Sequence, residues 1–197
     1  QLPKKALVQH FEKLAANQSP DSLADFVKAA DGEVRGRLNF QEYTDMRAAQ
    51  RRSGTPIKPS KLGYGFATGI VGKVAGNKLE LFNVGHVNGF LLRGRKITII
   101  PTTRGLSAFG YNHKADIAQP KKLEIRPGDK LVFVTDGLTA VREKSTGEYV
   151  YTDKSILQVL KKNARRSPEE LKQTIFQEVA RNGKIFDDAS ALVIAVN

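Results

Sequence analysis

Two apolar stretches in the second half of the chain are each bordered by aspartate. Residues 131–135 are aliphatic, aromatic or β-branched, a composition typical of a strand buried on both faces. Asp136 follows this stretch directly, and Asp187 and Asp188 precede the second stretch, residues 191–196. We expect the two strands to lie close together and to bring Asp136 and Asp187 to one site.

The residues on either side of the first stretch indicate sharp changes of chain direction. Arg126-Pro127-Gly128-Asp129 contains a Pro-Gly pair suited to a type II turn, because proline fixes φ at the second position and glycine tolerates the positive φ of the third. Gly137 allows the backbone to turn away after Asp136. Such an arrangement presents a carboxylate at the rim of a sheet, although Asp136 could also serve only as the turn residue that closes its strand.

Helical periodicity appears at both ends of the chain. Apolar residues recur every three or four positions in residues 4–18, 19–37, 153–163 and 167–183. Ser19 and Ser167 are each followed by proline and an acidic residue, a combination typical of a helix start. We therefore expect amphipathic helices that cover a sheet.

Strand-like patterns occupy the centre of the chain. They cover residues 66–74, 78–84, 90–93 and 96–100. The order of elements is then two helices, meandering strands, two helices and a final strand. This order predicts an α+β fold with an antiparallel sheet and helices packed outside it.

Residues 39–61 are mostly polar and rich in arginine, with two X-Pro bonds. We interpret them as a mobile surface loop within a single domain of residues 1–197, because long irregular segments of compact domains are usually functional or mobile.

Composition narrows the class of protein. The 197 residues suffice for one domain with a core, and no run approaches the roughly 18 apolar residues of a membrane span. The chain has no cysteine, which excludes disulfides and thiolate metal sites and is consistent with a cytoplasmic location.

The chain carries a large positive charge. It has 32 Lys and Arg against 20 Asp and Glu, a net charge of +12. This balance favours acidic partners such as phosphoproteins, or it describes only a solvated basic face. No zinc-ligand spacing or aromatic RNA-binding signature accompanies the charge, so a nucleic-acid partner is not expected.

Several short motifs occur together in one order along the chain. They are Asn83-Val84-Gly85-His86, Arg126-Pro127-Gly128-Asp129, Val134-Thr135-Asp136-Gly137-Leu138-Thr139, Ser145-Thr146-Gly147-Glu148-Tyr149, Ser167-Pro168-Glu169-Glu170-Leu171 and Phe186-Asp187-Asp188-Ala189-Ser190. The ordered set resembles the metal-dependent Ser/Thr protein phosphatases (PPM type), and among them the SpoIIE-like bacterial branch.

The resemblance implies a fold, a chemistry and a set of ligands. The fold is an antiparallel β-sandwich flanked by helices in four αββα layers. The site holds two Mn²⁺ or Mg²⁺ ions, which activate a water that attacks phosphoserine or phosphothreonine without a covalent intermediate. By position, Asp136 and Asp187 are the metal ligands, Asp188 is the alternative one residue away, and Gly137 and His86 support the site. His86 is expected to act mainly by fixing the hairpin. The substrate would be a phosphorylated bacterial regulatory protein.

One part of the family pattern has no counterpart here. The family carries an earlier Asp and an Asp-Gly pair on strands before the first helix, and nothing before Lys4 supplies them. Asp31-Gly32 is rejected as a substitute because it lies in a helical pattern. We therefore interpret the chain as an N-terminally incomplete domain that is inactive alone and associates with itself or with the missing N-terminal segment. The alternative is a degenerate phosphatase-fold module that binds a protein partner without catalysis.

Overall fold

The structure is a computed structural model that describes residues 23–37, 52, 68–104, 108–109, 119–142, 146, 149–183, 185 and 188–197. The predicted helix of residues 4–18 lies outside these residues, as does the predicted loop of residues 39–61 except Arg52. The chain divides into two compact units. One comprises Gln1–Lys73, Glu80–Gly85 and Thr103–Lys121, and the other comprises Val74–Leu79, His86–Thr102 and Lys122–Asn197.

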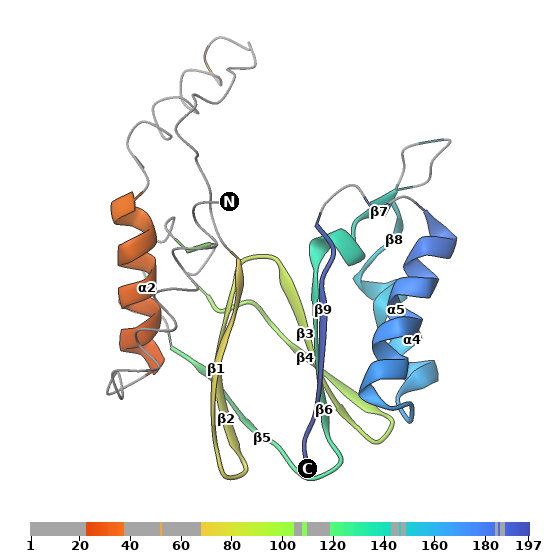
Figure 1. The fold of residues 1–197 in the computed structure, drawn as a ribbon, viewed down its shortest axis with the longest axis horizontal. Helices are drawn as coiled ribbons and strands as arrows, with labels where there is room; N and C mark the ends of the chain where they lie inside the picture. Colours follow the sequence, from red (N-terminus) through yellow and green to blue (C-terminus); the bar gives the residue numbers. More distant parts are fainter. Residues whose placement is uncertain are drawn as a thin grey trace. The chain divides into compact units, whose positions relative to one another are not determined.

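The second unit contains a four-stranded antiparallel sheet (Figure 1). Its strand order is β4-β3-β6-β9, with bounds of Lys96–Ile100, Val87–Arg93, Lys130–Thr135 and Ala191–Ala195 respectively. The predicted pairing of the two apolar stretches is confirmed, because β6 pairs with β9 along its length. Leu131 to Val134 are all buried, as expected for a central strand.

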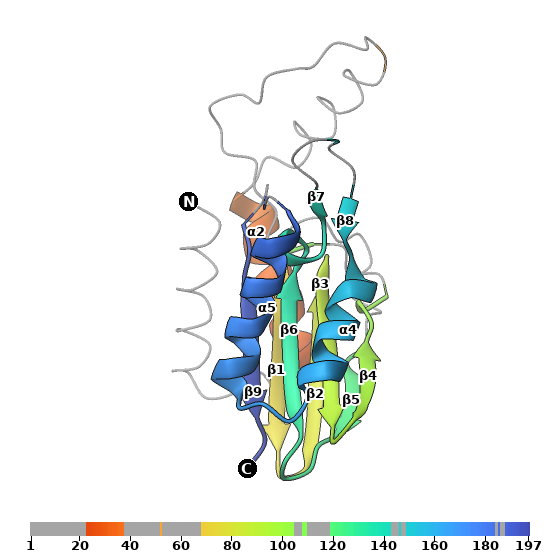
Figure 2. The same ribbon diagram turned by 90° about the vertical axis from the view of Figure 1, so that its right-hand side faces the viewer.

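Two helices cover one face of this sheet. Figure 2 shows α4 (Asp153–Asn163) and α5 (Pro168–Asn182) side by side over the strands. Their buried positions, which include Ile156, Leu160 and Ile175, pack with the inward residues of β3 and β6 in one apolar core. The predicted start of α5 is confirmed: the amide of Glu170 donates to Ser167 Oγ, and the amide of Ser167 donates to the Glu170 carboxylate.

The first unit contains the helix α2 (Leu23–Arg37), which agrees with the predicted helix of residues 19–37. Its buried side chains Leu23, Val27 and Ala30 belong to an apolar cluster with Phe82 and Phe109.

A second sheet has the strand order β1-β2-β5, with bounds of Gly69–Ala75, Lys78–Val84 and Lys121–Glu124.

The predicted type II turn of residues 126–129 is confirmed. Gly128 has φ 87°, and the amide of Asp129 donates to the carbonyl of Arg126 at 3.0 Å. The turn is joined to the end of β9, because Gly128 N donates to Val196 O at 2.8 Å and Val196 N donates to Asp129 O at 2.9 Å. The chain between β5 and β6 is thus fixed to the last strand.

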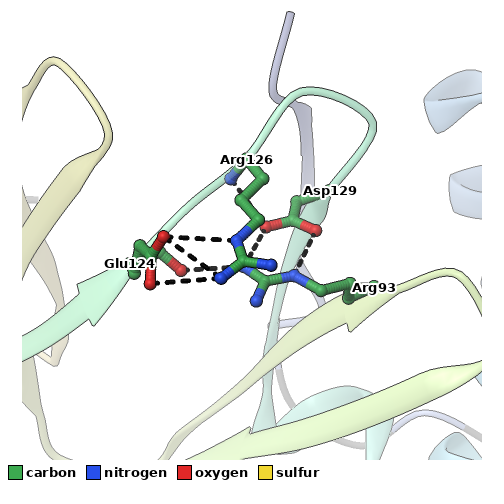
Figure 3. Close-up of polar contacts among 4 residues, drawn as sticks. All are labelled: Arg93, Glu124, Arg126 and Asp129. Atoms are coloured by element: carbon green, nitrogen blue, oxygen red, sulfur yellow. Dashed lines mark hydrogen bonds and ion pairs between the residues drawn. The ribbon is translucent and has the colours of Figure 1, made fainter.

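The side chain of Asp129 adds a second restraint to this turn (Figure 3). The carboxylate is 2% exposed and accepts hydrogen bonds from Arg93 Nε at 2.9 Å and from Arg93 Nη2 at 2.7 Å. The amide of Arg126 donates to the same carboxylate at 2.8 Å. These hydrogen bonds, the one with Arg93 above all, hold the pKa of Asp129 below its ordinary value and outweigh the opposing effect of burial.

The α+β fold class is confirmed: in the described part of the chain, antiparallel sheets are accompanied by flanking helices. Some bounds were wrong. β3 begins at Val87 rather than at residue 90, because Val87 already pairs with Thr135. Three strands lie where no strand was predicted: β5, β7 (Val141–Arg142) and β8 (Tyr149–Tyr151). Each is too short to show an alternating pattern.

Candidate functional site at the Asp136 end of the sheet

Three segments that are far apart in the sequence meet at one end of the four-stranded sheet. Val87 at the start of β3 lies opposite Thr135 at the end of β6, and Ala191 at the start of β9 lies opposite Val134. His86, Asp136 and residues 188–190 are the neighbours of these paired positions in the sequence. We call this part of the molecule the Asp136 end.

Thr135 joins β6 to the segment that leads into β9. Its Oγ1 donates to the carbonyl of Asp188 at 3.1 Å and accepts from the amide of Ser190 at 2.9 Å, and its own amide donates to Ser190 O at 3.0 Å. These three hydrogen bonds hold the backbone of Asp188 beside the residue that precedes Asp136. The threonine of the Thr-Asp-Gly motif therefore fixes the spacing between the two acidic segments.

Asp136 opens a short 3-10 helix, η2 (Asp136–Leu138). Its carbonyl accepts hydrogen bonds from the amides of Thr139 at 2.9 Å and Ala140 at 2.8 Å, so the chain turns sharply at the end of β6. Gly137 and Leu138 are buried, whereas Asp136 is half-buried. Among the residues that the structure describes, the carboxylate of Asp136 has no hydrogen-bond or ion-pair partner, which leaves its oxygens available for a ligand.

Asn88 connects the turn after Asp136 to helix α4. Its side-chain amide donates to Thr139 Oγ1 at 3.2 Å and to Asp153 Oδ1 at 2.9 Å. Because Asp153 is the first residue of α4, this contact joins β3, the end of η2 and a helix start. The position of the Asp136 turn is therefore fixed from a second side.

Four of the predicted site residues lie at the Asp136 end, namely Asp136, Gly137, Asp188 and His86. Of these, Asp188 and His86 are exposed. Asp187 lies outside the described residues, so its role and the choice between Asp187 and Asp188 remain predictions. The rejection of Asp31-Gly32 agrees with the structure, because both residues lie inside α2.

Sequence reasoning missed the polar residues that organise this end, namely Thr135, Asn88, Thr139, Asp153 and Ser190. Thr135 and Thr139 both belong to the recognised motif of residues 134–139. Membership in that motif was a sequence signal that could have identified Thr135. Asn88 and Asp153 are 65 positions apart and belong to no common motif. Only the folded chain brings these two residues together.

The acidic residues at the Asp136 end have the chemistry of metal ligands. Carboxylate oxygens are the ligands that Mn²⁺ and Mg²⁺ prefer. In the described ranges, however, no group of three or more His, Asp or Glu side chains is arranged to hold a metal ion. Asp136 and Asp188 thus carry suitable oxygens but do not by themselves form a complete metal site.

The described helices do not fit the requirements of a membrane span. None of them combines the length and apolar composition needed to cross a bilayer.

Solved structures share this fold. The catalytic domain of the serine/threonine phosphatase PstP, in complex with two manganese ions, matches 98% of this chain and 79% of its own length at 18% identity and a TM-score of 0.57. The phosphatase domain of the cell fate determinant SpoIIE from Bacillus subtilis, presoaked with manganese, matches 97% of this chain and 73% of its own at 15% identity and a TM-score of 0.56.

A third match is less extensive. The SiaA-PP2C domain of Pseudomonas aeruginosa matches 61% of this chain at 15% identity and a TM-score of 0.52, and the chain spans 47% of that domain's length. At these identities the structural matches show the fold alone. Comparison with curated protein sequences gave no match.

The sequence itself identifies the family. The profile of the stage II sporulation protein E (SpoIIE) family matches residues 5–197, which is nearly the whole chain. The match includes all the motifs at the Asp136 end, from His86 to Asp188. The chain therefore belongs to the SpoIIE family.

Proposed function

We propose that the Asp136 end is part of the centre of a metal-dependent phosphatase that hydrolyses phosphoserine or phosphothreonine. The observation that carries this proposal is the set of hydrogen bonds of Thr135, which hold the segment of Asp188 beside Asp136. Membership in the SpoIIE family and the manganese ions of the PstP structure support a role for Mn²⁺ or Mg²⁺.

Asp136 and Asp187 are the proposed metal ligands, with Asp188 as the alternative to Asp187. The available carboxylate of Asp136 supports its assignment, since a ligand side chain needs free oxygens. The carbonyl of Asp188 is bound to Thr135, which orients this segment toward the end of β6. His86 and Gly137 are proposed to support the site through the geometry of the strand ends.

The proposal is tested by removing one charge at a time in the full-length protein. Asp136→Asn and Asp187→Asn should each lower Mn²⁺-dependent hydrolysis of a phosphopeptide by more than about a hundredfold, because each removes a metal ligand. Thr135→Val keeps the side-chain shape and removes the hydroxyl. Because it weakens the support of the site, it should lower activity roughly 10- to 100-fold.

Glu178→Gln is the matched control, since Glu178 is an acidic residue of α5 that pairs with Arg181. It should retain normal activity. Circular dichroism should show that all four variants are folded. A folded Asp136→Asn variant with near-normal activity would remove Asp136 from the site.

A phosphatase-fold module without catalysis is the second candidate. The observation that favours it is the lack of a three-residue acidic or histidine cluster in the described part of the chain. The two candidates differ in the dependence of partner binding on metal. A module without catalysis would bind its phosphoprotein equally well in EDTA and in Mn²⁺, and would release no phosphate in either.

The substrate is proposed to be a phosphorylated bacterial regulatory protein. The net charge of +12 supports an acidic or phosphorylated partner. The sequence also predicts that the chain associates with itself. Such self-association would be seen as a mass above that of the monomer when residues 1–197 are measured by light scattering.

A further inference from the structure

A basic pocket lies at the C-terminal end of α4, in the second unit. Its volume is about 360 Å³. The lining comes from the β3–β4 hairpin turn and from the end of α4 with the residues that follow it, namely Arg95, Lys161, Lys162, Asn163, Ala164, Arg165 and Arg166. Five of these seven residues carry a positive charge, so two separate segments bring cations to one concave surface.

In the described part of the chain, most of these cations have no neutralising acidic group. Among the residues that the structure describes, Arg95, Lys161, Lys162 and Arg165 have no acidic partner, and all four are exposed. Arg166 differs, because its Nη1 donates to Thr174 Oγ1 at 2.6 Å and its charge lies near Glu170. Arg166 therefore has a structural contact, whereas the other four cations remain available to an anion.

The end of a helix favours positive charge, and this effect alone could explain two lysines in the last turn of α4. Several carbonyls there already have donors, however. Asn163 Nδ2 donates to Val159 O at 2.8 Å, Arg166 N donates to Asn163 O at 3.0 Å, and Lys130 Nζ donates to Ala164 O at 2.9 Å. The helix end thus has its own hydrogen bonds, and Arg95, which comes from a different segment, is not explained by it.

The pocket is remote from the proposed phosphatase centre. β3 begins beside the Asp136 end at Val87 and ends at Arg93, two residues before Arg95. Seven residues of strand span roughly 20 Å. Figure 2 shows α4 running along the same sheet, so the two ends of one helix belong to different sites.

We propose that this pocket binds a chain of phosphate groups, either free polyphosphate or the phosphates of a nucleotide. Arginine guanidinium groups match phosphate oxygens in pairs, and lysines add point charges. None of the described residues that line the pocket is aromatic, so recognition by these residues rests on charge rather than on stacking of a base. The concave shape and its volume fit a small ligand better than the flat face of an acidic protein.

The test measures binding of sodium tripolyphosphate to the protein by calorimetry, at low salt and without divalent metal. The absence of metal makes the measurement independent of the proposed phosphatase activity. The double variant Lys161→Gln/Arg165→Gln should bind at least about tenfold more weakly, because it loses two charge-assisted contacts. Lys154→Gln is the matched control, since Lys154 is an exposed lysine of the same helix at its other end, and it should bind normally.

A second measurement distinguishes a loss of tripolyphosphate binding from a folding defect of the double variant. Tripolyphosphate should raise the unfolding temperature of the wild-type protein and of Lys154→Gln, but not that of the double variant. Without ligand the double variant should unfold at an equal or higher temperature than wild type, because two like charges have been removed.

A comparison of ATP with tripolyphosphate distinguishes a nucleotide from free polyphosphate as the ligand of the pocket. ATP and tripolyphosphate binding with similar affinity would support a site for the phosphate chain alone, and tighter binding of ATP would assign the phosphates to a nucleotide. Equal affinity of the double variant and the wild type for tripolyphosphate would overturn the proposal. So would a hexaglutamate peptide that binds as tightly as tripolyphosphate, because charge alone would then attract any acidic chain.

Discussion

At the scale of single residues, Asp129 does more than its place in a Pro-Gly turn indicates. Its carboxylate is buried and is bound through both oxygens by Arg93, with a third hydrogen bond from the amide of Arg126. A buried carboxylate without such donors would be strongly unfavourable. Asp129 and Arg93 therefore hold the β3 end, the turn and the start of β6 in one arrangement.

Removing the charge of Asp129 should change how stability depends on pH. The folded-state pKa of Asp129 lies below its ordinary value of 3.8, so its contribution to stability is complete above about pH 5 and is lost as the pH falls through the lowered pKa. Asp129→Asn should lower the free energy of unfolding at pH 7 by about 1–3 kcal/mol. As the pH falls below about 5, this variant should lose less stability than wild type in urea unfolding experiments.

Glu169→Gln provides the comparison for this experiment. Glu169 pairs with Lys172 at 2.7 Å, but its side chain is 63% exposed, so the pair should contribute less than about 1 kcal/mol. Parallel stability curves for wild type and Asp129→Asn below about pH 5 would contradict the role given to Asp129.

At the scale of single residues, the sequence could predict only those residues of the candidate site that belong to a short motif. Asp136 and Gly137 were found because they follow an apolar stretch within a recognised sequence. Asn88 and Asp153 were missed, since a hydrogen bond between residues 65 positions apart leaves no trace in local composition. Sequence motifs thus identified the acidic residues, whereas the polar contacts that hold them required the fold.

At the scale of elements, Gly89 sets how closely β3 approaches its neighbours. A Cβ atom at this position would lie 3.0 Å from Ile100 Cβ and 3.1 Å from a ring carbon of Phe133. Both neighbours are buried and belong to paired strands, so neither moves aside easily. Gly89→Ala should therefore lower the free energy of unfolding by about 1–3 kcal/mol, measured by urea denaturation.

Gly69→Ala is the matched control on another strand. A Cβ atom at Gly69 would meet no atom within 4 Å, and its φ is not in the positive range. This variant should be neutral or slightly more stable. If Gly89→Ala were equally neutral, the spacing of β3 and β4 would be more adjustable than the packing indicates.

The elements that were predicted well share a physical property. Helices α4 and α5 are amphipathic and have clear N-terminal signals, so their bounds were found from the sequence. The strand β5 was missed because its four residues, Lys-Lys-Leu-Glu, are too few to show an alternating pattern and are exposed apart from the half-buried Leu123. Short strands owe their structure to neighbours, and the neighbours are not visible in their own sequence.

At the scale of the whole molecule, the charge of +12 should make stability depend on salt. Repulsion among excess cations disfavours the compact state, and salt screens it. Raising NaCl from about 10 to 200 mM at neutral pH should raise the unfolding temperature. Sucrose at matched osmolality is the control. A falling unfolding temperature would show that attractive pairs such as Arg93 and Asp129 outweigh the general repulsion.

The pairing of β6 with β9 has a consequence for folding during synthesis. β9 begins 55 residues after Asp136, and its partner β6 is a central strand whose four middle residues are buried. A ribosome will have released β3, β4 and β6 into solution before β9 has left the exit tunnel. During that interval β6 has a vacant edge, and such edges attract other chains. The nascent chain should therefore need protection by chaperones until residue 195 emerges.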